Sequence, residues 1–248
     1  MALSSKMRFA GKAPAKAEQR FVTLRDLPDV QIKLHNNARA RRYGLRVSRS
    51  GGAVTLTIPA RGTEKDALEF ALAHQDWLRE AVARLPPVTR IRYGASILYE
   101  GTEVQLVPGQ GRLPVQEGQM LFVPGPEDRM ARKLESFLKH HARRRLQVAT
   151  EQYAAQIGQS FSAITLRDTR SRWGSCSSKG ALSYSWRLIM APPEVLDYVA
   201  AHEVAHLVEM NHSSAFWAIV EKLRPDWRAE RRWLRDEGGR LHATHFRD

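Results

Sequence analysis

The sequence predicts an α+β protein in which a β-rich N-terminal domain precedes a mainly helical C-terminal domain. Short stretches before residue 60 alternate apolar and polar side chains, as strands with one buried face do. After residue 126, apolar residues recur at helical spacing over longer stretches. Pro124-Gly125-Pro126 lies between the two patterns, and we place the domain boundary there because proline and glycine interrupt regular structure.

Residues 21–125 should form the β-rich domain. Val30–Leu34 and Val54–Ile58 alternate in the manner of strands, and Tyr43–Val47 lies between them as a third strand. The turn signal Ser50-Gly51-Gly52 precedes the last of these strands. This order predicts a hairpin or a meander.

The same domain should contain one helix. Thr63 is suited to an N-cap, and the helix is expected to continue to about Leu85, where Pro86-Pro87 stops it. Short strands separated by glycines should then fill residues 88–123.

Residues 126–241 should form the helical domain, which begins with one long helix from about Glu127 to Ile157. Three helices are expected near its end, the first opened by a pair of prolines and the second capped by a serine. In chain order we expect a strand over 161–166, a glycine- and serine-rich loop over 171–180, a strand over 181–186, and helices over 195–210, after Ser213 and over 227–236.

Both chain ends are expected to be tails. Residues 1–20 are basic, small and polar, which favours a disordered basic tail. A mitochondrial-type presequence is the alternative, because no acidic residue precedes Glu18. Residues 242–248 are assigned to a short C-terminal tail.

Composition limits the protein class. The hydrophobic fraction of 43% is ordinary for a folded chain, and no apolar run approaches the ~20 residues of a membrane helix. The single cysteine, Cys176, excludes an intramolecular disulfide and favours a reducing compartment, so we expect a cytoplasmic protein without membrane partners. Cys176 itself is either redox-active or a small buried side chain.

The formal net charge is +13, and basic residues form two local clusters. A basic surface can bind phosphate backbones through counterion release, so nucleic acid is a possible partner. It can equally be a solvated face, because charge alone does not specify a ligand. The clusters are Arg39, Arg41, Arg42 and Arg46, and then Lys139, Arg143, Arg144 and Arg145.

The pattern with the clearest chemistry is His202-Glu203-Val204-Ala205-His206, on an expected helix. Residues four apart on a helix lie about 40° apart around its axis, so both imidazoles can face one metal ion. Zinc suits imidazole nitrogen ligands. Glu203 lies beside the first ligand, where it can reach a metal-bound water instead of the metal. The alternative is a pair of buried helix histidines with satisfied hydrogen bonds.

A third histidine, His212, follows His206 by six residues, beyond an expected chain reversal near Asn211. Three protein ligands to one Zn²⁺ per chain leave a position open for water, as a catalytic site requires. The metal would acidify that water, and Glu203 would act as the general base. These residues therefore predict a metal-dependent hydrolase. A catalytically inactive scaffold is disfavoured because Glu203 is present.

Beyond this site, the chain resembles the YgjP-like family of predicted zinc metallopeptidases, relatives of SprT and Wss-type proteases. The resemblance covers about residues 32–241 and is most specific over 170–217. Its N-terminal part includes Arg39-Ala40-Arg41-Arg42. The segments that carry it are Arg170-Ser171-Arg172-Trp173-Gly174-Ser175-Cys176, Trp186-Arg187-Leu188-Ile189, Ala191-Pro192-Pro193, Asp197-Tyr198-Val199, His202–Leu207, Asn211-His212-Ser213, Phe216-Trp217, Pro225-Asp226 and Trp233-Leu234.

This resemblance implies a zincin-like metallopeptidase domain behind the β-rich domain, and peptide or protein substrates. It also implies zinc ligation by His202, His206 and His212, with Glu203 as the catalytic base. A nucleic-acid-associated metalloprotease acting on DNA-bound proteins is the alternative, although the chain lacks zinc-finger cysteine pairs.

Arg172 is a further candidate for the site, since its loop could border it. An arginine there could bind a substrate carboxylate or stabilise an oxyanion. The simpler interpretation is that Arg172 bonds to backbone carbonyls while Trp173 packs.

Overall fold

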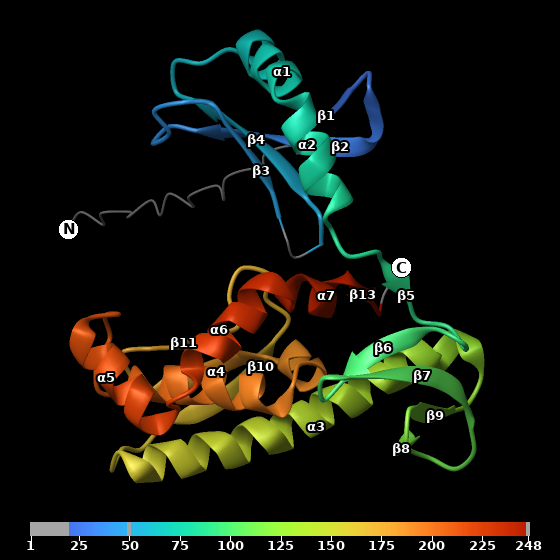
Figure 1. The fold of residues 1–248 in the computed structure, drawn as a ribbon, viewed down its shortest axis with the longest axis vertical. Helices are drawn as coiled ribbons and strands as arrows, with labels where there is room; N and C mark the ends of the chain where they lie inside the picture. The colour runs from blue at the N-terminus through green and yellow to red at the C-terminus, as the bar shows by residue number, and fades with distance from the viewer. Residues whose placement is uncertain (1–19, 49–50, 247–248) are drawn as a thin grey trace, which may run out of the picture. The chain divides into compact units, whose positions relative to one another are not determined.

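The computed structural model describes residues 20–48 and 51–246 and confirms the α+β class and the β-rich N-terminal region (Figure 1). The expected basic tail lies, up to residue 19, outside the described residues. The chain divides into two compact units: the first runs to Val47 and includes Ala53–Arg79, and the second holds Ser48–Gly52 and the chain from Glu80 onward. None of the helices within these described ranges is long and apolar enough to cross a membrane.

The first unit contains a four-stranded sheet in the order β1-β2-β4-β3. β3 and β4 are antiparallel, so the predicted hairpin is present, but β4 pairs in parallel with β2 and the strands do not form a meander. The central strands β2 and β4 carry the fully buried Ile32 and Leu56, and β1 and β3 lie at the edges. The strands are β1 (Phe21–Leu24), β2 (Leu27–Asn37), β3 (Gly44–Val47) and β4 (Val54–Pro59).

The helix expected from Thr63 to Leu85 consists of two helices, α1 (Glu64–Ala73) and α2 (Gln75–Ala83). Thr63 caps α1 as predicted, because its hydroxyl accepts a hydrogen bond from the Asp66 backbone N–H at 3.1 Å. The break is at His74, whose ring nitrogen Nδ1 lies 2.8 Å from the Phe70 carbonyl oxygen. A continuous helix would use that oxygen for the residue-74 backbone N–H, which instead bonds to the Ala71 and Leu72 carbonyls.

The second unit begins with the short strand β5 (Thr89–Arg90) and a sheet in the order β6-β7-β9-β8. This sheet repeats the pattern of the first one: two antiparallel pairs are joined by a central parallel pair, β7 with β9. Its strands are β6 (Ser96–Tyr99), β7 (Thr102–Gly109), β8 (Val115–Glu117) and β9 (Met120–Pro124).

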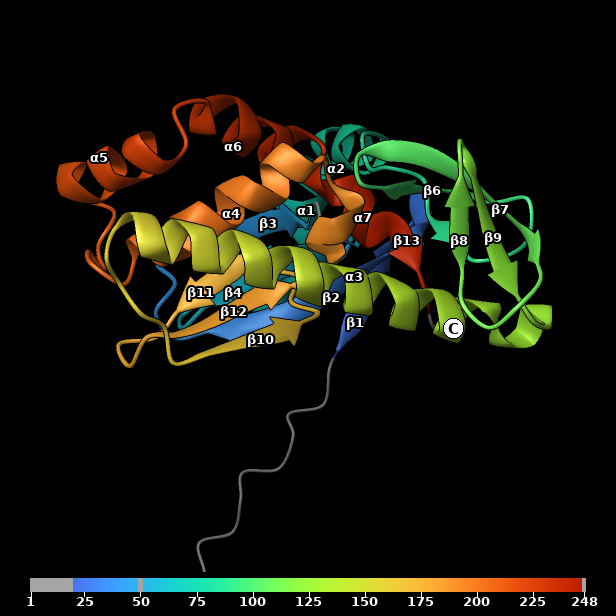
Figure 2. The same ribbon diagram turned by 90° about the horizontal axis from the view of Figure 1, so that it is seen from below.

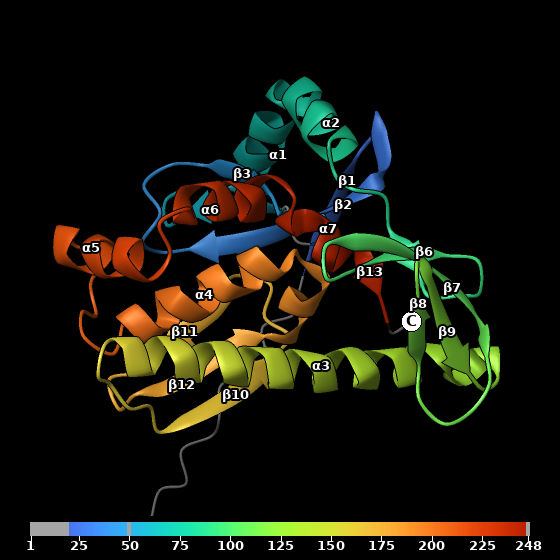
Figure 3. The ribbon, with the colours of Figure 1, turned by 60° about the horizontal axis from the view of Figure 1, so that its bottom comes forward.

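Helix α3 (Glu127–Gln156) matches the predicted long helix and runs the length of the second unit (Figure 3). Its buried Met130, Leu134 and Leu138 share one hydrophobic core with Leu106 and Val123 of the preceding sheet. The compact units therefore divide near Arg79, and Pro124-Gly125-Pro126 is a turn between β9 and α3 inside the second unit.

The other end of α3 lies against a three-stranded sheet in the order β10-β12-β11 (Figure 2). β10 and β12 are parallel, and β11 is an antiparallel edge strand. A short 3-10 helix and four α-helices complete the unit. These elements are β10 (Ala163–Arg167), β11 (Gly174–Cys176), β12 (Ala181–Ser185), η1 (Trp186–Met190), α4 (Pro193–Ala205), α5 (Ser214–Leu223), α6 (Trp227–Asp236) and α7 (Gly238–Ala243).

The residues assigned to a C-terminal tail are folded as far as 246. The end of α7 leads into β13 (Thr244–His245), which pairs in parallel with β5, and Phe246 is buried. The anchor is Arg187, a buried side chain whose Nη1 donates to the Leu241 and Thr244 carbonyls at 2.8 and 2.9 Å. Its other nitrogens contact Asp168 at 2.6 and 3.2 Å. The local sequence pattern did not predict that residues 242–246 are folded, because Arg187, which anchors them, lies more than fifty residues upstream.

We expect Arg187→Met to lower the free energy of unfolding by about 3 kcal/mol, because two buried carbonyl oxygens lose their donor. Asp168 adds little to this cost, since its side chain is 44% exposed and can be rehydrated. Urea denaturation measures the change. Arg228→Met is the control, since Arg228 pairs with Glu221 at the surface and its loss should cost no more than about 1 kcal/mol. Equal effects of the two substitutions would contradict the anchoring role.

Candidate metal centre

Helix α4 positions two of the three predicted histidines. It starts with Pro193 in its first turn, where proline needs no N–H partner, and it carries His202 on its last turn. The helix ends at Ala205 with His206 as its C-cap, five residues before the predicted end near Met210. The earlier end matters because the chain turns immediately and brings His212 back to the helix.

The three imidazoles converge as the spacing predicted. Nε2 of His202 lies 3.1 Å from Nε2 of His212, and one nitrogen from each of the three rings lies within 4.8 Å of the others. His202, His206 and His212 are the metal-ligand group found among the described parts of the chain. Burial, followed by the neighbouring His206 and His212, lowers the pKa of His202 to about 3, so its ring is neutral.

The loop over residues 206–213, which carries His212, is held by backbone and aromatic contacts. Nδ1 of His206 lies 3.0 Å from the Glu209 carbonyl oxygen, which leaves Nε2 of His206 available to the cluster. Glu209 therefore orients a histidine through its backbone, and its carboxylate accepts from the Asn211 N–H at 3.3 Å. Phe216 is fully buried, and its ring stacks on His206 with centroids 4.4 Å apart. Ser213 caps α5 as predicted by accepting from the Phe216 N–H.

Glu203 is 5% exposed and faces β11, where Gly174 makes room for it. A Cβ atom at position 174 would lie 2.4 Å from Oε1 of Glu203 and 2.6 Å from its Cγ, which no real side chain could tolerate. Burial raises the pKa of Glu203 to about 8, although the charge of Arg172 acts in the opposite direction. The carboxyl group is thus suited to holding a proton in a dry site.

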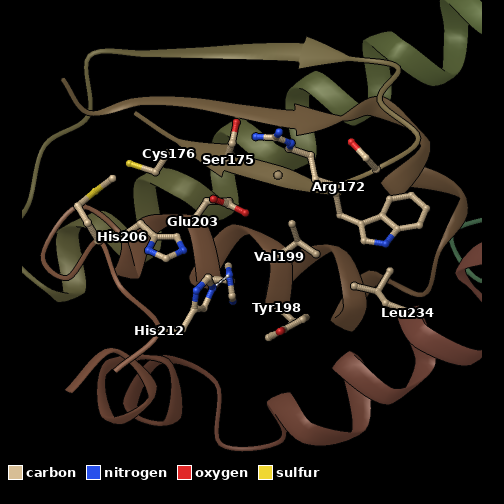
Figure 4. A pocket seen from close by; sticks show the side chains of 14 residues that line it. Arg172, Ser175, Cys176, Tyr198, Val199, Glu203, His206, His212 and Leu234 are labelled. Atoms are coloured by element: carbon tan, nitrogen blue, oxygen red, sulfur yellow. Dashed lines mark hydrogen bonds between the residues drawn. The ribbon is translucent and has the colours of Figure 1, made fainter. Parts of the chain in front are cut away.

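A cavity of about 580 Å³ opens over these residues (Figure 4). α4 forms its floor with side chains one turn apart, Tyr198 with His202 and Val199 with Glu203. The other walls come from β11, from the loop before it, and from α6 through Leu234. The cavity therefore joins the histidine cluster and the buried carboxyl group in one accessible space.

Arg172 lies above the cavity and lines it, as the sequence suggested (Figure 4). Its side chain is exposed, and within the described ranges its guanidinium donates no hydrogen bond to another group. The only local bond is to its backbone, where the Thr169 hydroxyl donates to the Arg172 carbonyl at 2.8 Å. The guanidinium is therefore available to an anionic group in the cavity.

The edge strand β11 offers free backbone groups to the same cavity. The Ser185 N–H donates to the Trp173 carbonyl, and the Ser177 N–H donates to the Ala181 carbonyl. Antiparallel pairs alternate, so Ser175 bonds to β12 while the N–H and C=O groups of Gly174 and Cys176 point to the free edge. An extended peptide could add to β11 by pairing with these groups.

Sequence reasoning missed several residues of the cavity wall. The four-residue spacing to His202 and Glu203 would have identified Tyr198 and Val199. Leu234 belongs to a segment that carries the family resemblance, but no local spacing places it or Met210 in the cavity, which both reach through the tertiary fold. Cys176 also lines it as a half-buried free thiol, and burial followed by the charge of Glu203 raises its pKa.

Three residues of the second basic cluster bond to groups of the same chain, although its arginines are exposed. Lys139 pairs with Glu135 at 2.7 Å, Arg145 lies 3.4 Å from Glu100, and Arg143 donates to the Ile164 carbonyl at 2.6 Å. The first cluster, Arg39, Arg41, Arg42 and Arg46, is exposed on the first unit. Neither cluster contributes to the cavity.

The chain is similar over 38% of its length to the metallopeptidase zymogen abylysin of Pyrococcus abyssi, at 23% identity, with 95% of that chain covered and a TM-score of 0.35. No curated protein matches the chain. The family model described as YgjP-like, metallopeptidase domain, matches residues 41–237. The protein therefore belongs to the YgjP-like family of metallopeptidases.

Proposed function

We propose that this metallopeptidase uses one Zn²⁺ per chain, bound by His202, His206 and His212, with Glu203 as general base. The observation that carries the proposal is the convergence of three imidazole nitrogens beside a buried carboxyl group in an open cavity. A structural zinc site would have four protein ligands, whereas this cluster has three. We infer that the remaining position serves water and substrate.

The donor set fits zinc. Two imidazole nitrogens on a tetrahedral zinc ion lie roughly 3.3 Å apart, given Zn–N distances of ~2.0–2.1 Å, and the two Nε2 atoms of His202 and His212 are 3.1 Å apart. The bond from His206 Nδ1 to a backbone carbonyl is typical of metal-ligating histidines, because it orients the ring and selects its tautomer. All three ligands are neutral nitrogen donors, as zinc prefers.

When bound, the zinc ion would acidify a water molecule and polarise the scissile carbonyl. Glu203 accepts the proton as the water oxygen attacks the carbonyl carbon, and it delivers that proton to the departing amine nitrogen as the C–N bond breaks. Its burial supports this role, since a carboxyl group in a dry site exchanges a proton more readily near neutral pH than an exposed one.

Arg172 has two roles that fit its position. Its guanidinium can donate hydrogen bonds to the oxyanion that forms as water attacks, or it can bind a carboxylate of the peptide. Because the free edge of β11 can hold an extended chain, we propose peptide or unfolded protein segments as substrates. The interpretation in which Arg172 bonds to backbone carbonyls has no support in its contacts within the described ranges.

The ligand assignment predicts that the chain binds one zinc ion, measured by metal analysis after dialysis. His206→Ala should lose stoichiometric zinc, because two ligands do not hold the ion in place. His140→Ala is the matched control, since His140 lies on α3 outside the cluster and its loss should leave the zinc content unchanged. Full zinc retention by His206→Ala would refute the assignment.

The base assignment predicts that Glu203→Gln keeps its zinc but loses peptide hydrolysis by roughly 100-fold or more. The amide nearly preserves the size of the carboxyl group and removes only its ability to accept the proton. Turnover on a denatured protein substrate and zinc content should be measured on the same sample. Unchanged turnover would mean that the base lies elsewhere.

The packing of Glu203 on Gly174 predicts that Gly174→Ala loses roughly 100-fold in turnover while zinc stays bound, because the new methyl group displaces the carboxyl group. Gly44→Ala is the matched control: it also lies on an edge strand, but its Cβ would meet only Thr57 at 4.0 Å. In the Gly174→Ala background, Glu203→Asp should cause little further loss. Additive losses would show that Gly174 acts independently of Glu203.

A further inference from the structure

The cavity has two chemically different halves. Figure 4 shows His206, His212, Glu203 and Cys176 on one side, with Val199 and Leu234 lying toward the other. Trp173 lines the cavity as well, so α4, α6 and the loop before β11 each contribute an apolar side chain. The half with histidines and a carboxyl group is used by the proposed reaction. The apolar half has no role in that chemistry.

The indole of Trp173 is held rigidly in this wall. Its ring lies against His242, with centroids 4.9 Å apart. Gly238, one turn before His242 on α7, also lies against the indole, since an added Cβ there would come within 2.9 Å of Cζ2 of Trp173. The C-terminal segment anchored by Arg187 therefore supports the indole from behind. A wall that is rigid before binding costs little ordering entropy when a ligand packs on it.

The spacing along α4 relates this wall to the reacting centre. Val199 precedes Glu203 by one helical turn, and both face the cavity. One turn advances ~5.4 Å along the axis, which is between one and two residues of an extended peptide at ~3.3 Å each. A substrate side chain that enters between Trp173, Val199 and Leu234 therefore belongs to a residue adjacent to the scissile peptide bond, which lies beside Glu203.

We infer that Trp173, Val199 and Leu234 form a specificity subsite for an apolar side chain adjacent to the scissile bond. This inference rests on the proposed peptidase function for its biological meaning, but the subsite itself follows from the cavity wall. Leucine, methionine and phenylalanine side chains are the class it accepts, since the three walls offer them only apolar contacts. Charged side chains lose hydration against these three apolar walls.

Peptide profiling tests the subsite through two substitutions with opposite effects. The zinc-loaded chain should cleave a peptide library with leucine, methionine or phenylalanine enriched at one position flanking the cut. Leu234→Ala should shift that position toward larger side chains, because the cavity widens. Gly238→Ala should shift it toward smaller ones, because the methyl group pushes Trp173 into the cavity. Leu72→Ala is the matched control, an exposed leucine of α1 in the first unit.

Binding without turnover separates the subsite from the peptidase function. The probes are two zinc-chelating compounds, N-acetyl-leucine hydroxamate and N-acetyl-glycine hydroxamate, which differ only in the isobutyl group. Calorimetry on the zinc-loaded chain should show the leucine compound binding roughly tenfold or more tightly. Leu234→Ala should reduce this ratio, while Leu72→Ala should preserve it.

The outcomes are distinct. Preferential binding of the leucine compound without any peptide cleavage would support the subsite and overturn the proposed function. Peptide cleavage without enrichment at a flanking position, together with equal binding of the two hydroxamates, would overturn the subsite and leave the function intact. A preference for charged side chains at that position would also contradict the inference.

Discussion

The close approach of helix α4 to strand β11 at Gly174 is the constraint on which the rest of the site depends. A Cβ atom at this position would overlap the side chain of Glu203, so the carboxyl group can keep its present place only beside a glycine. Because Glu203 is enclosed here, it is dry, and its pKa is raised by burial. The same approach places the free edge of β11 beside the histidines of α4. The absence of a side chain at Gly174 thus brings together the proposed base, the proposed metal ligands and the edge strand.

The remaining architecture holds this contact in place. α3 supports both the sheet that contains β11 and the helix α4, and the shared core of these elements is almost entirely apolar. Arg187 connects the C-terminal segment to Asp168 at the start of the loop that carries Arg172 and Trp173. Burying an arginine costs desolvation free energy. Here an ion pair and two backbone carbonyl acceptors offset that cost. The C-terminal segment is therefore part of the active-site support.

The sequence predicted the fold class and the clustering of the three histidines, but not how the strands pair. His202 and Glu203 lie on α4 and His206 is its C-cap, so local spacing was enough to bring them together, and the expected chain reversal near Asn211 returns His212 to them. The parallel pairing of β2 with β4 and of β7 with β9 could not be predicted, because alternation identifies a strand and not its neighbour. The fold of residues 242–246 and the place of Leu234 in the cavity depend on contacts between distant segments, which leave no local pattern.

X-ray absorption spectroscopy of the zinc-loaded chain tests the central claim most directly, because it reports the atoms around the ion without requiring a known substrate. The proposed site predicts one zinc ion with three imidazole nitrogens at ~2.0–2.1 Å and one further oxygen ligand, and replacing any one of His202, His206 and His212 should abolish this spectrum because stoichiometric zinc is lost. A sulfur neighbour at ~2.3 Å would place Cys176 in the metal shell, and four protein ligands would indicate a closed structural site. Either result would contradict a catalytic centre built from these three histidines and Glu203.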